Sequence, residues 1–251
     1  MKKRLDQLLV ERALFPSRTR AQAAIMAGLV YVDGQKIDKA GQLIKDGAGV
    51  EVRGEVHPFV GRGGVKLAHA LKEFKIDVTG RTALDVGAST GGFTDCLLQN
   101  GAAKVYAIDV GYGQLDWKLR NDLRVIVMER TNIRDLTWDE LKQKTPNSEL
   151  RTPNLAVIDV SFISLSKVFP AVYNLLADEA EVVALIKPQF EAKREQVGKG
   201  GIVRSDEVRS EVVEKVKVAA EAIGFKVKGL TQSPIEGADG NVEFLIHLAK
   251  G

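Results

Sequence analysis

A glycine-rich stretch in the first half of the chain has the residue types and spacing of a ligand site. Thr82–Val86 is a short apolar run that contains one acid, Asp85, and it leads into Gly87-Ala88-Ser89-Thr90-Gly91-Gly92. Phe93 then begins a helical pattern. Glycines let a backbone approach a ligand where a Cβ would clash, and the start of the following helix offers unpaired N–H groups. This succession of strand, tight turn and helix predicts a site for a nucleotide-like cofactor.

Four charged residues stand at the ends of other expected elements. Asp159 directly follows one apolar run, Lys187 directly follows another, and Glu243 lies near the start of the last one. Lys66 falls in the first turn of a helix expected from about Val65, where a cation faces the positive end of the helix dipole at a cost of about 0.3–1 kcal/mol. Taken singly, each of these could be a solvent-exposed charge without a function.

The elements that must position these residues alternate between strands and helices. Helical patterns at Leu165–Leu176 and Glu207–Ile223 separate apolar runs, which favours a mostly parallel sheet with helices on both faces, an α/β Rossmann-like fold. Leu230–Gly240 shows no helical pattern, so we expect the final strand to be antiparallel. After Thr82–Val86, the expected strands are Lys104–Ile108, Val125–Met128, Leu155–Ile158, Val182–Ile186, Phe225–Gly229 and Val242–Leu248.

Polar residues at the carboxyl ends of these strands narrow the choice of cofactor. Ligands of such sheets bind beyond this edge, where Asp109 ends the second strand and Asn132 follows the third. A carboxylate at the position of Asp109 suits the ribose of a dinucleotide and of S-adenosyl-L-methionine alike. The turn lacks the G-x-G-x-x-G spacing that cradles a pyrophosphate, which argues against a nicotinamide cofactor. A turn that binds no ligand is the third possibility.

Composition excludes several classes of protein. The 251 residues are 45% hydrophobic and 27% charged, enough for a substantial core, and no apolar run approaches the roughly 18 residues of a membrane helix. The basic start lacks the apolar stretch of a signal peptide, and the single Cys96 cannot form an internal disulfide. The three histidines are scattered, so no metal site is expected. We therefore expect a cytoplasmic protein without a membrane segment.

The charge of the chain is unevenly distributed. Residues 1–62 hold 11 Lys and Arg against 7 Asp and Glu, whereas the remainder holds 25 against 26, and the whole chain has a net charge of +3. A basic segment ahead of a near-neutral body favours binding to a polyanion, although a solvated basic surface would look the same.

This basic segment also has the pattern of a small folded unit. Leu5, Leu8 and Leu9 predict a first helix, and Ser17 is placed to cap a second one that ends at Gly28. Leu29–Val32, the turn pair Asp33-Gly34 and Gln35–Ile37 predict a hairpin, and Gly49–Arg53 a further strand.

The N-terminal pattern resembles the small RNA-binding domain named after the fourth protein of the small ribosomal subunit. Arg4-Leu5-Asp6, Ser17-Arg18 with Ala21, and Ile25-x-x-Gly28-x-Val30-x-Val32-Asp33-Gly34 carry the resemblance. It implies that a helical face and the adjoining hairpin bind structured RNA and that arginines contact its phosphates. Arginine suits this role because its planar guanidinium group can donate two hydrogen bonds to one phosphate. The expected RNA-binding residues here are Arg4, Arg18 and Arg20.

A glycine-rich stretch separates this unit from the rest. Residues 53–64 contain four glycines and a proline, a composition typical of a domain boundary. We expect an RNA-binding domain at residues 1–58, a linker at 59–64 and a cofactor domain at 65–251.

The whole chain resembles the TlyA, or haemolysin A, family of rRNA 2′-O-methyltransferases. Five separated segments carry the resemblance in order: Gly61–Leu67, Asp85–Phe93, Asp159–Ser164, Lys187–Phe190 and Val197–Gly201. Lys66, Asp159, Lys187 and Glu243 then resemble the Lys-Asp-Lys-Glu tetrad of FtsJ-type enzymes. The resemblance implies S-adenosyl-L-methionine as cofactor. The implied binding residues are Asp85, Gly87, Ser89, Gly91, Gly92, Phe93, Asp109 and Asn132.

The resemblance also implies a mechanism and a substrate. Lys187 would accept the proton of a ribose 2′-hydroxyl or hold its oxygen in line, Asp159 would orient Lys187, and Lys66 and Glu243 would fix the neighbouring geometry. The substrate would be ribosomal RNA, free or in subunits, with cytidine as the nucleotide and no obligate protein partner. Cations expected to follow RNA phosphates around the site, unless they are merely solvated, are Arg62, Lys193, Arg194, Lys199 and Arg204.

Two other functions remain open at this point. A membrane-lytic toxin is suggested by the family's older name, although the sequence shows no spanning helix. The other is an RNA-binding ribosome assembly factor whose methyltransferase fold is inert, against which the complete tetrad argues.

Overall fold

The computed structural model describes residues 2–15, 17–26, 28–53, 58–145, 150–237 and 240–251, and the side chains of residues 20, 23 and 26 lie outside the description. Internal contacts divide the chain into an N-terminal unit, Met1–Pro58, and a C-terminal unit, Phe59–Gly251. Residues 59–64, predicted as a linker, are held within the C-terminal unit, because Val60 N donates to Asp95 Oδ2 over 2.9 Å and α3 begins at Gly63.

The N-terminal unit is a small α+β fold with its own core. Its hairpin turns at Asp33 and Gly34, both of which have positive φ, the geometry that suits a two-residue connection. β2 pairs with β3 and β5, and β1 pairs with β4, all antiparallel. The elements are β1 (Lys2–Arg4), α1 (Leu5–Glu11), α2 (Arg18–Met26), β2 (Val30–Val32), β3 (Gln35–Lys36), β4 (Leu43–Lys45) and β5 (Val50–Val52).

The predicted unit of two helices, a hairpin and a further strand is therefore present, with two strands more than the sequence indicated. The apolar faces of the helices, including Leu5, Leu8 and Ile25, pack with Val30 and Ile44 into one cluster. β1 and β4 were not expected, since their residues are mostly charged or exposed.

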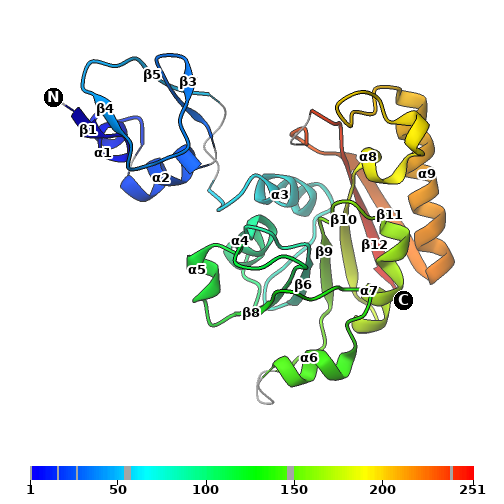
Figure 1. Ribbon diagram of the computed structural model, residues 1–251. Coiled ribbons are helices and arrows are strands. Elements are labelled where there is room, and N and C mark those ends of the chain that lie inside the picture. Colours follow the sequence, from blue (N-terminus) through cyan, green and yellow to red (C-terminus); the bar gives the residue numbers. More distant parts are fainter. Residues whose placement is uncertain (1, 16, 27, 54–57, 146–149, 238–239) are drawn as a thin grey trace. The chain divides into compact units, whose positions relative to one another are not determined.

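The C-terminal unit is built on a seven-stranded sheet with the order β11-β12-β10-β9-β6-β7-β8 (Figure 1). β12 runs antiparallel to both of its neighbours and the other paired strands are parallel, which confirms the predicted sheet. The strands are β6 (Thr82–Val86), β7 (Lys104–Ile108), β8 (Val125–Met128), β9 (Leu155–Ile158), β10 (Glu181–Ile186), β11 (Phe225–Gln232) and β12 (Phe244–Lys250).

Helices cover both faces of this sheet. Leu67 of α3 (Gly63–Glu73), Leu97 of α4 (Gly92–Gln99) and Leu119 of α5 (Trp117–Arg120) belong to the core on one face. Leu141, Val172 and Val216 belong to the core on the other. They lie in α6 (Trp138–Lys144), α7 (Phe169–Leu175) and α9 (Asp206–Ile223), and the remaining short helices are η2 (Leu165–Lys167), α8 (Pro188–Glu191) and η3 (Arg194–Gln196).

The strand register brings the expected site residues to one edge. Val86 pairs with Ile108 and Ile158, and Ile186 pairs with Phe244 at the start of the antiparallel β12. Residues that follow β6, β7, β9 and β10 therefore share an edge with residues that precede β12. The crossovers turn in opposite directions at β6 and β9, so this edge also contains the switch point where such folds bind ligands.

Candidate active site

All four charged residues of the expected tetrad line one open cavity at the switch point. Its volume is about 440 Å³. The expected cofactor residues Gly87, Ser89, Gly92 and Phe93 line it too, so the structure brings both predicted groups together. The lining is completed by Arg62, Gly63, Ala88, Thr90, Ser161, Phe162, Gln189 and Phe190.

Lys66 and Glu243 form a buried ion pair on one side of the cavity. Lys66 lies on α3 and Glu243 immediately precedes β12, and their Nζ and Oε2 atoms are 2.5 Å apart. The side chains are only 9% and 2% exposed. A buried charge without a partner is costly, so each residue holds the other in place. Glu243 was expected inside the last strand and instead lies one residue before it.

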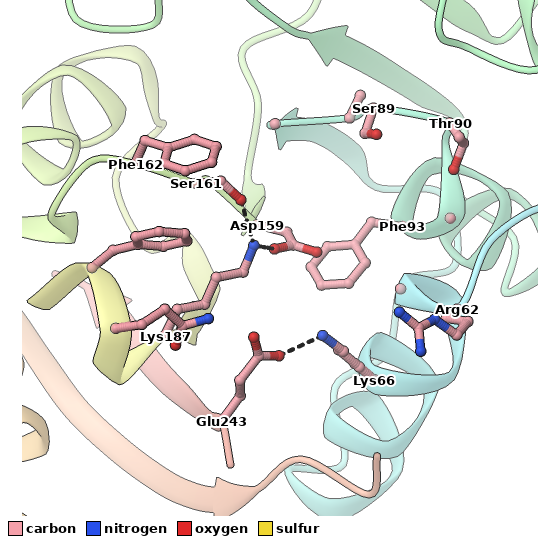
Figure 2. A pocket seen from close by; sticks show the side chains of 16 residues that line it. Arg62, Lys66, Ser89, Thr90, Phe93, Asp159, Ser161, Phe162, Lys187 and Glu243 are labelled. Atoms are coloured by element: carbon pink, nitrogen blue, oxygen red, sulfur yellow. Dashed lines mark hydrogen bonds and ion pairs between the residues drawn. The ribbon is translucent and has the colours of Figure 1, made fainter. Parts of the chain in front are cut away.

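Lys187 and Asp159 form a second ion pair, drawn from the ends of two adjacent parallel strands. Lys187 Nζ lies 2.6 Å from Asp159 Oδ1 and donates to Ser161 Oγ over 2.9 Å. Figure 2 shows the ammonium between these two residues, with the Lys66–Glu243 pair nearby. Both side chains of this pair are mostly buried, at 13% and 22% exposure. The cavity therefore contains two ammonium groups, each matched to its own carboxylate.

The turn after β6 forms another wall of the cavity. Gly87 N donates to Ile108 O, and a Cβ at Gly87 would collide with the carbonyl of Asp159. Gly87 and Gly91 have φ values of 87° and 95°, a region that favours glycine. Glycine is thus required where the turn packs against the loop after β9. Gly91 N-caps α4 and does not itself line the cavity.

Asp85 lies beneath the turn and does not line the cavity. Its side chain is fully buried, Oδ2 accepts from Thr94 Oγ1 over 2.6 Å, and Oδ1 has no hydrogen-bond partner in the described part of the chain. Burial raises the pKa of Asp85 to about 7, with a lesser contribution from the nearby Asp159 carboxylate. Asp85, expected as a cofactor ligand, therefore stabilises the turn from below.

A second, small cavity adjoins the first one on the other side of the turn. Both cavities include Ala88 and Ser89, and the second is also lined by Asp109 and Glu129. Asp109 accepts from the backbone N of Ser89 over 2.8 Å and of Gly111 over 2.7 Å. A ligand lying over the turn would thus meet Asp159 at one end and Asp109 at the other.

Asn132, by contrast, lines neither cavity. Its Oδ1 accepts from the backbone N and the Nε of Arg134, at 3.2 and 3.3 Å, so the side chain stabilises a local turn. Glu129 directly follows β8 and lines the small cavity, where Asn132 was expected. Its Oε1 accepts from Gly113 N over 2.8 Å, and the sequence offered the signal, since Glu129 directly follows the apolar run of β8.

Two aromatic residues of the cavity were not singled out from the sequence. Phe162 is 90% exposed, has a φ of 63°, and its ring centroid is 4.9 Å from that of Phe190. A phenylalanine with positive φ is uncommon, and an exposed aromatic ring beside a polar cavity is a feature of binding sites. Both rings lie in segments that carry the family resemblance, Asp159–Ser164 and Lys187–Phe190, but neither was expected as a site residue.

The expected RNA-binding cations fall into two groups. In the C-terminal unit, Arg62 lines the cavity, whereas the others are exposed side chains that do not: Lys193, Arg194, Lys199 and Arg204. In the N-terminal unit, Arg4 and Arg18 both contact Asp6, and the side chain of Arg20 lies outside the described residues.

Asp6 organises the N-terminal arginines. It is fully buried, and its carboxylate accepts from Arg4 at 3.0 and 3.1 Å, from Arg18 at 2.8 Å and from Gln22 at 2.6 Å. These donors hold the pKa of Asp6 well below its usual range. The arginine side chains remain 41% and 49% exposed, so their outer faces are open to a ligand.

Among the described residues, no group of three or more His, Cys, Asp or Glu could hold a metal ion. No described helix is both long and apolar enough to cross a membrane.

Known proteins share both units of this chain. The family model of FtsJ-like methyltransferases matches residues 59–250, and that of the S4 domain matches residues 3–50. The fold and the site therefore define an FtsJ-like methyltransferase domain preceded by an S4 domain.

Individual relatives narrow this class. The 16S/23S rRNA (cytidine-2'-O)-methyltransferase TlyA of Mycobacterium tuberculosis is 44% identical over 98% of this chain and 89% of its own. Hemolysin A of Brachyspira hyodysenteriae is 45% identical over 97% of this chain and 98% of its own. A solved structure from Streptococcus thermophilus, described provisionally as a hemolysin, has a TM-score of 0.76 and 48% identity, covering 99% of this chain and 88% of that one. The chain belongs to the TlyA, or hemolysin A, family.

Proposed function

We propose that this protein transfers a methyl group from S-adenosyl-L-methionine to a ribose 2′-hydroxyl of ribosomal RNA, at cytidine. The observation that carries the proposal is the single cavity in which the Lys66–Glu243 and Lys187–Asp159 pairs meet the glycine turn. Relatives named as rRNA (cytidine-2'-O)-methyltransferases over nearly the whole chain support the substrate.

The residues around the turn fit S-adenosyl-L-methionine. When bound, this cofactor supplies an electrophilic methyl group on a positively charged sulfur. Asp159 offers a carboxylate at the large cavity, which suits a cation, and Asp109 offers one at the small cavity, where its oxygens retain capacity for ribose hydroxyls. Ala88 and Ser89, shared by both cavities, would lie beneath the middle of the molecule. Asp85 supports the turn from below, and Gly87 leaves it room to pack closely.

Lys187 is the residue that acts on the ribose. Its ammonium already meets Asp159 and Ser161, which leaves a hydrogen to donate to the 2′-oxygen and so to direct a lone pair of that oxygen toward the methyl group. Because Lys187 remains an ammonium in this arrangement, the Asp159 carboxylate is the member of the pair that accepts the proton lost by the 2′-oxygen. Positioning of this kind is the main requirement of an in-line displacement.

Lys66 and Glu243 hold the opposite side of the cavity. Because they are buried and paired with each other, they present a fixed donor and acceptor to the ribose and its neighbouring phosphate. Phe162 offers an exposed ring at the same cavity, on which the base of the target nucleotide would stack once it leaves its helix.

RNA affinity comes from cations outside the catalytic pairs. Arg4 and Arg18 of the N-terminal unit are partly exposed and held in place by Asp6, which suits phosphate binding. Arg62 at the cavity and the exposed cations of residues 193–204 provide a further phosphate-binding rim.

Transfer of a radiolabelled methyl group tests this function. Purified protein is incubated with labelled S-adenosyl-L-methionine and with small subunits, large subunits or free rRNA, and the labelled nucleoside is then identified. We expect 2′-O-methylcytidine. No transfer to any of these RNAs, with RNA binding intact, would favour the assembly-factor alternative, and label on a base would contradict the proposed reaction.

A further inference from the structure

The cavity depends on a loop that is fastened at both ends to one short segment. The loop comprises residues 159–165, from the end of β9 to the first residue of η2, and it contains Asp159, Ser161 and Phe162. The segment is Lys187–Glu191, which follows β10 and includes α8. Lys187 holds the beginning of the loop through Asp159 and Ser161, as described above.

Glu191 holds the other end of the loop. Its Oε2 accepts from Ser164 Oγ over 2.6 Å and its Oε1 accepts from Leu165 N over 2.6 Å. The side chain is only 5% exposed, so both bonds are shielded from water. Both oxygens of the carboxylate act as acceptors here, whereas a glutamine amide has only one acceptor atom and could meet Ser164 only by donating to its Oγ.

The segment itself is anchored on a third element. Lys215 of α9 donates through Nζ to the carbonyl oxygen of Glu191 over 2.7 Å. Ser164 also N-caps η2, with Oγ accepting from Ser166 N. Glu191 therefore joins the loop to the part of the fold that carries Lys187.

Phe162 lies between the two fastened ends. Its positive φ is a backbone state that persists only where the surroundings impose it. Contact of its ring with Phe190 of the same segment, together with the bonds at both ends of the loop, provides that constraint.

We propose that Glu191 is a positioning residue of the catalytic site, which fixes the loop at 159–165 so that Asp159 and Ser161 meet Lys187 and Phe162 faces the cavity. This role rests on the proposed methyl transfer for its consequence in catalysis. Glu191 does not line the cavity. Burial raises the pKa of Glu191 above its ordinary value, which shows that the fold accepts an electrostatic cost at this position.

Glu191→Gln tests the role, because it keeps the size of the side chain and removes one acceptor. Ser164→Ala removes the hydroxyl that donates to Glu191 Oε2. Glu214→Gln is the matched control, a glutamate of α9 whose side chain is 67% exposed and lies outside the site. Each variant is measured for kcat and KM with rRNA, for cofactor affinity, for its thermal midpoint, and for amide hydrogen exchange in residues 159–168 without substrate.

We expect Glu191→Gln to lower kcat at least tenfold and to speed exchange of the Leu165 amide, while cofactor affinity stays within twofold and the control matches wild type. Ser164→Ala should give a smaller loss, and the double variant should lose less than the product of the two single effects. Glu191→Asp, which restores both acceptors, should recover part of the rate.

Two results would overturn the role. One is a Glu191→Gln variant with wild-type kcat and unchanged exchange. The other is a parallel fall of kcat, cofactor affinity and thermal midpoint, which would indicate a general structural role. If wild type itself transfers no methyl group, the proposed function fails, and faster exchange at Leu165 in Glu191→Gln still supports the fastening of the loop.

Discussion

The two units use their cations in different ways. In the N-terminal unit, the guanidinium groups of Arg4 and Arg18 share the single carboxylate of Asp6, and both remain about half exposed. In the cavity of the C-terminal unit, each lysine has its own carboxylate and is mostly buried. The first arrangement leaves one positive charge in excess at the surface, and the second leaves none.

We expect this difference to separate RNA affinity from catalysis. Excess exposed charge attracts a polyanion at long range, whereas paired buried charges fix the position of donors and acceptors. Changes in the N-terminal cluster should therefore alter RNA binding and its salt dependence, and changes in the cavity pairs should alter turnover.

The largest effect should come from breaking the buried pair of Lys66 and Glu243. Lys66→Met or Glu243→Gln alone leaves an unpaired buried charge, which should destabilise the fold by about 3–5 kcal/mol in urea unfolding. The double variant should recover most of this stability because no charge is left unpaired. All three variants should lose at least about 100-fold in methyl transfer. Wild-type turnover in the stable double variant would show that the pair is only structural.

Two buried aspartates should give the units opposite pH dependences. The pKa of Asp85 is raised to about 7 in the folded state, above the ~3.9 of an unfolded chain. The folded state thus holds a proton that the unfolded state releases, and stability should fall as the pH rises from about 4 to about 7, by up to about 4 kcal/mol. Asp85→Asn should flatten this slope in urea titrations, and an unchanged slope would contradict the assignment.

Asp6 provides the contrasting case. Its folded pKa is lowered by the arginines, so its contribution to stability is present above ~3.9 and is lost as the pH falls below that value. Asp6→Asn should reduce stability at neutral pH and remove part of the acid-side loss. A variant that instead flattened the slope between pH 4 and 7 would refute the contrast.

A smaller effect is expected at the exposed ring of Phe162. Base stacking on an aromatic side chain contributes about 1–3 kcal/mol, so Phe162→Ala should raise KM for rRNA about 5- to 160-fold. Cofactor affinity should stay within twofold in a direct titration. Leu123→Ala is the control, since Leu123 is 92% exposed and lines neither cavity. Equal behaviour of the two variants would exclude a stacking role.

The smallest effects should come from the N-terminal arginines one at a time. Arg4→Ala or Arg18→Ala should each lower the slope of log affinity against log salt by about 0.7–0.9, with kcat unchanged. Arg12→Ala is the control, because Arg12 donates to the carbonyl oxygens of Asp46 and Ala48 and so stabilises the fold. A change of slope in Arg12→Ala as large as in the other two would weaken the assignment.

Much of the fold could be predicted because its strongest signals are local. β6, β7, β8 and β9 have the predicted bounds, since each is a mainly apolar run followed directly by a glycine or a charged residue. β1 and β4 could not be predicted, because a strand of three residues is too short to show a clear alternating pattern, and Ile44 is the one buried side chain among these six residues. β11 extends to Gln232, beyond the expected end at Gly229. It is an edge strand, and its polar residues have the composition of a loop.

The site was predictable in position and less so in detail. A charge that follows an apolar run lies at the correct edge of the sheet, which placed Asp159 and Lys187. The same rule does not tell which way a side chain points, and Asp85 and Asn132, which the resemblance placed at the cofactor, line neither cavity. Glu191 and Ser161 were missed because their partners come from another strand end, a contact that only the fold creates.

Mapping of 2′-O-methyl groups on ribosomal RNA tests the central claim most directly. RNA is compared from cells that lack the protein and from the same cells supplied with wild type or Lys187→Ala at equal levels. We predict a cytidine methylated only with wild type, while Lys187→Ala still binds the RNA. Identical maps in all three, or methylation restored by Lys187→Ala, would contradict the account.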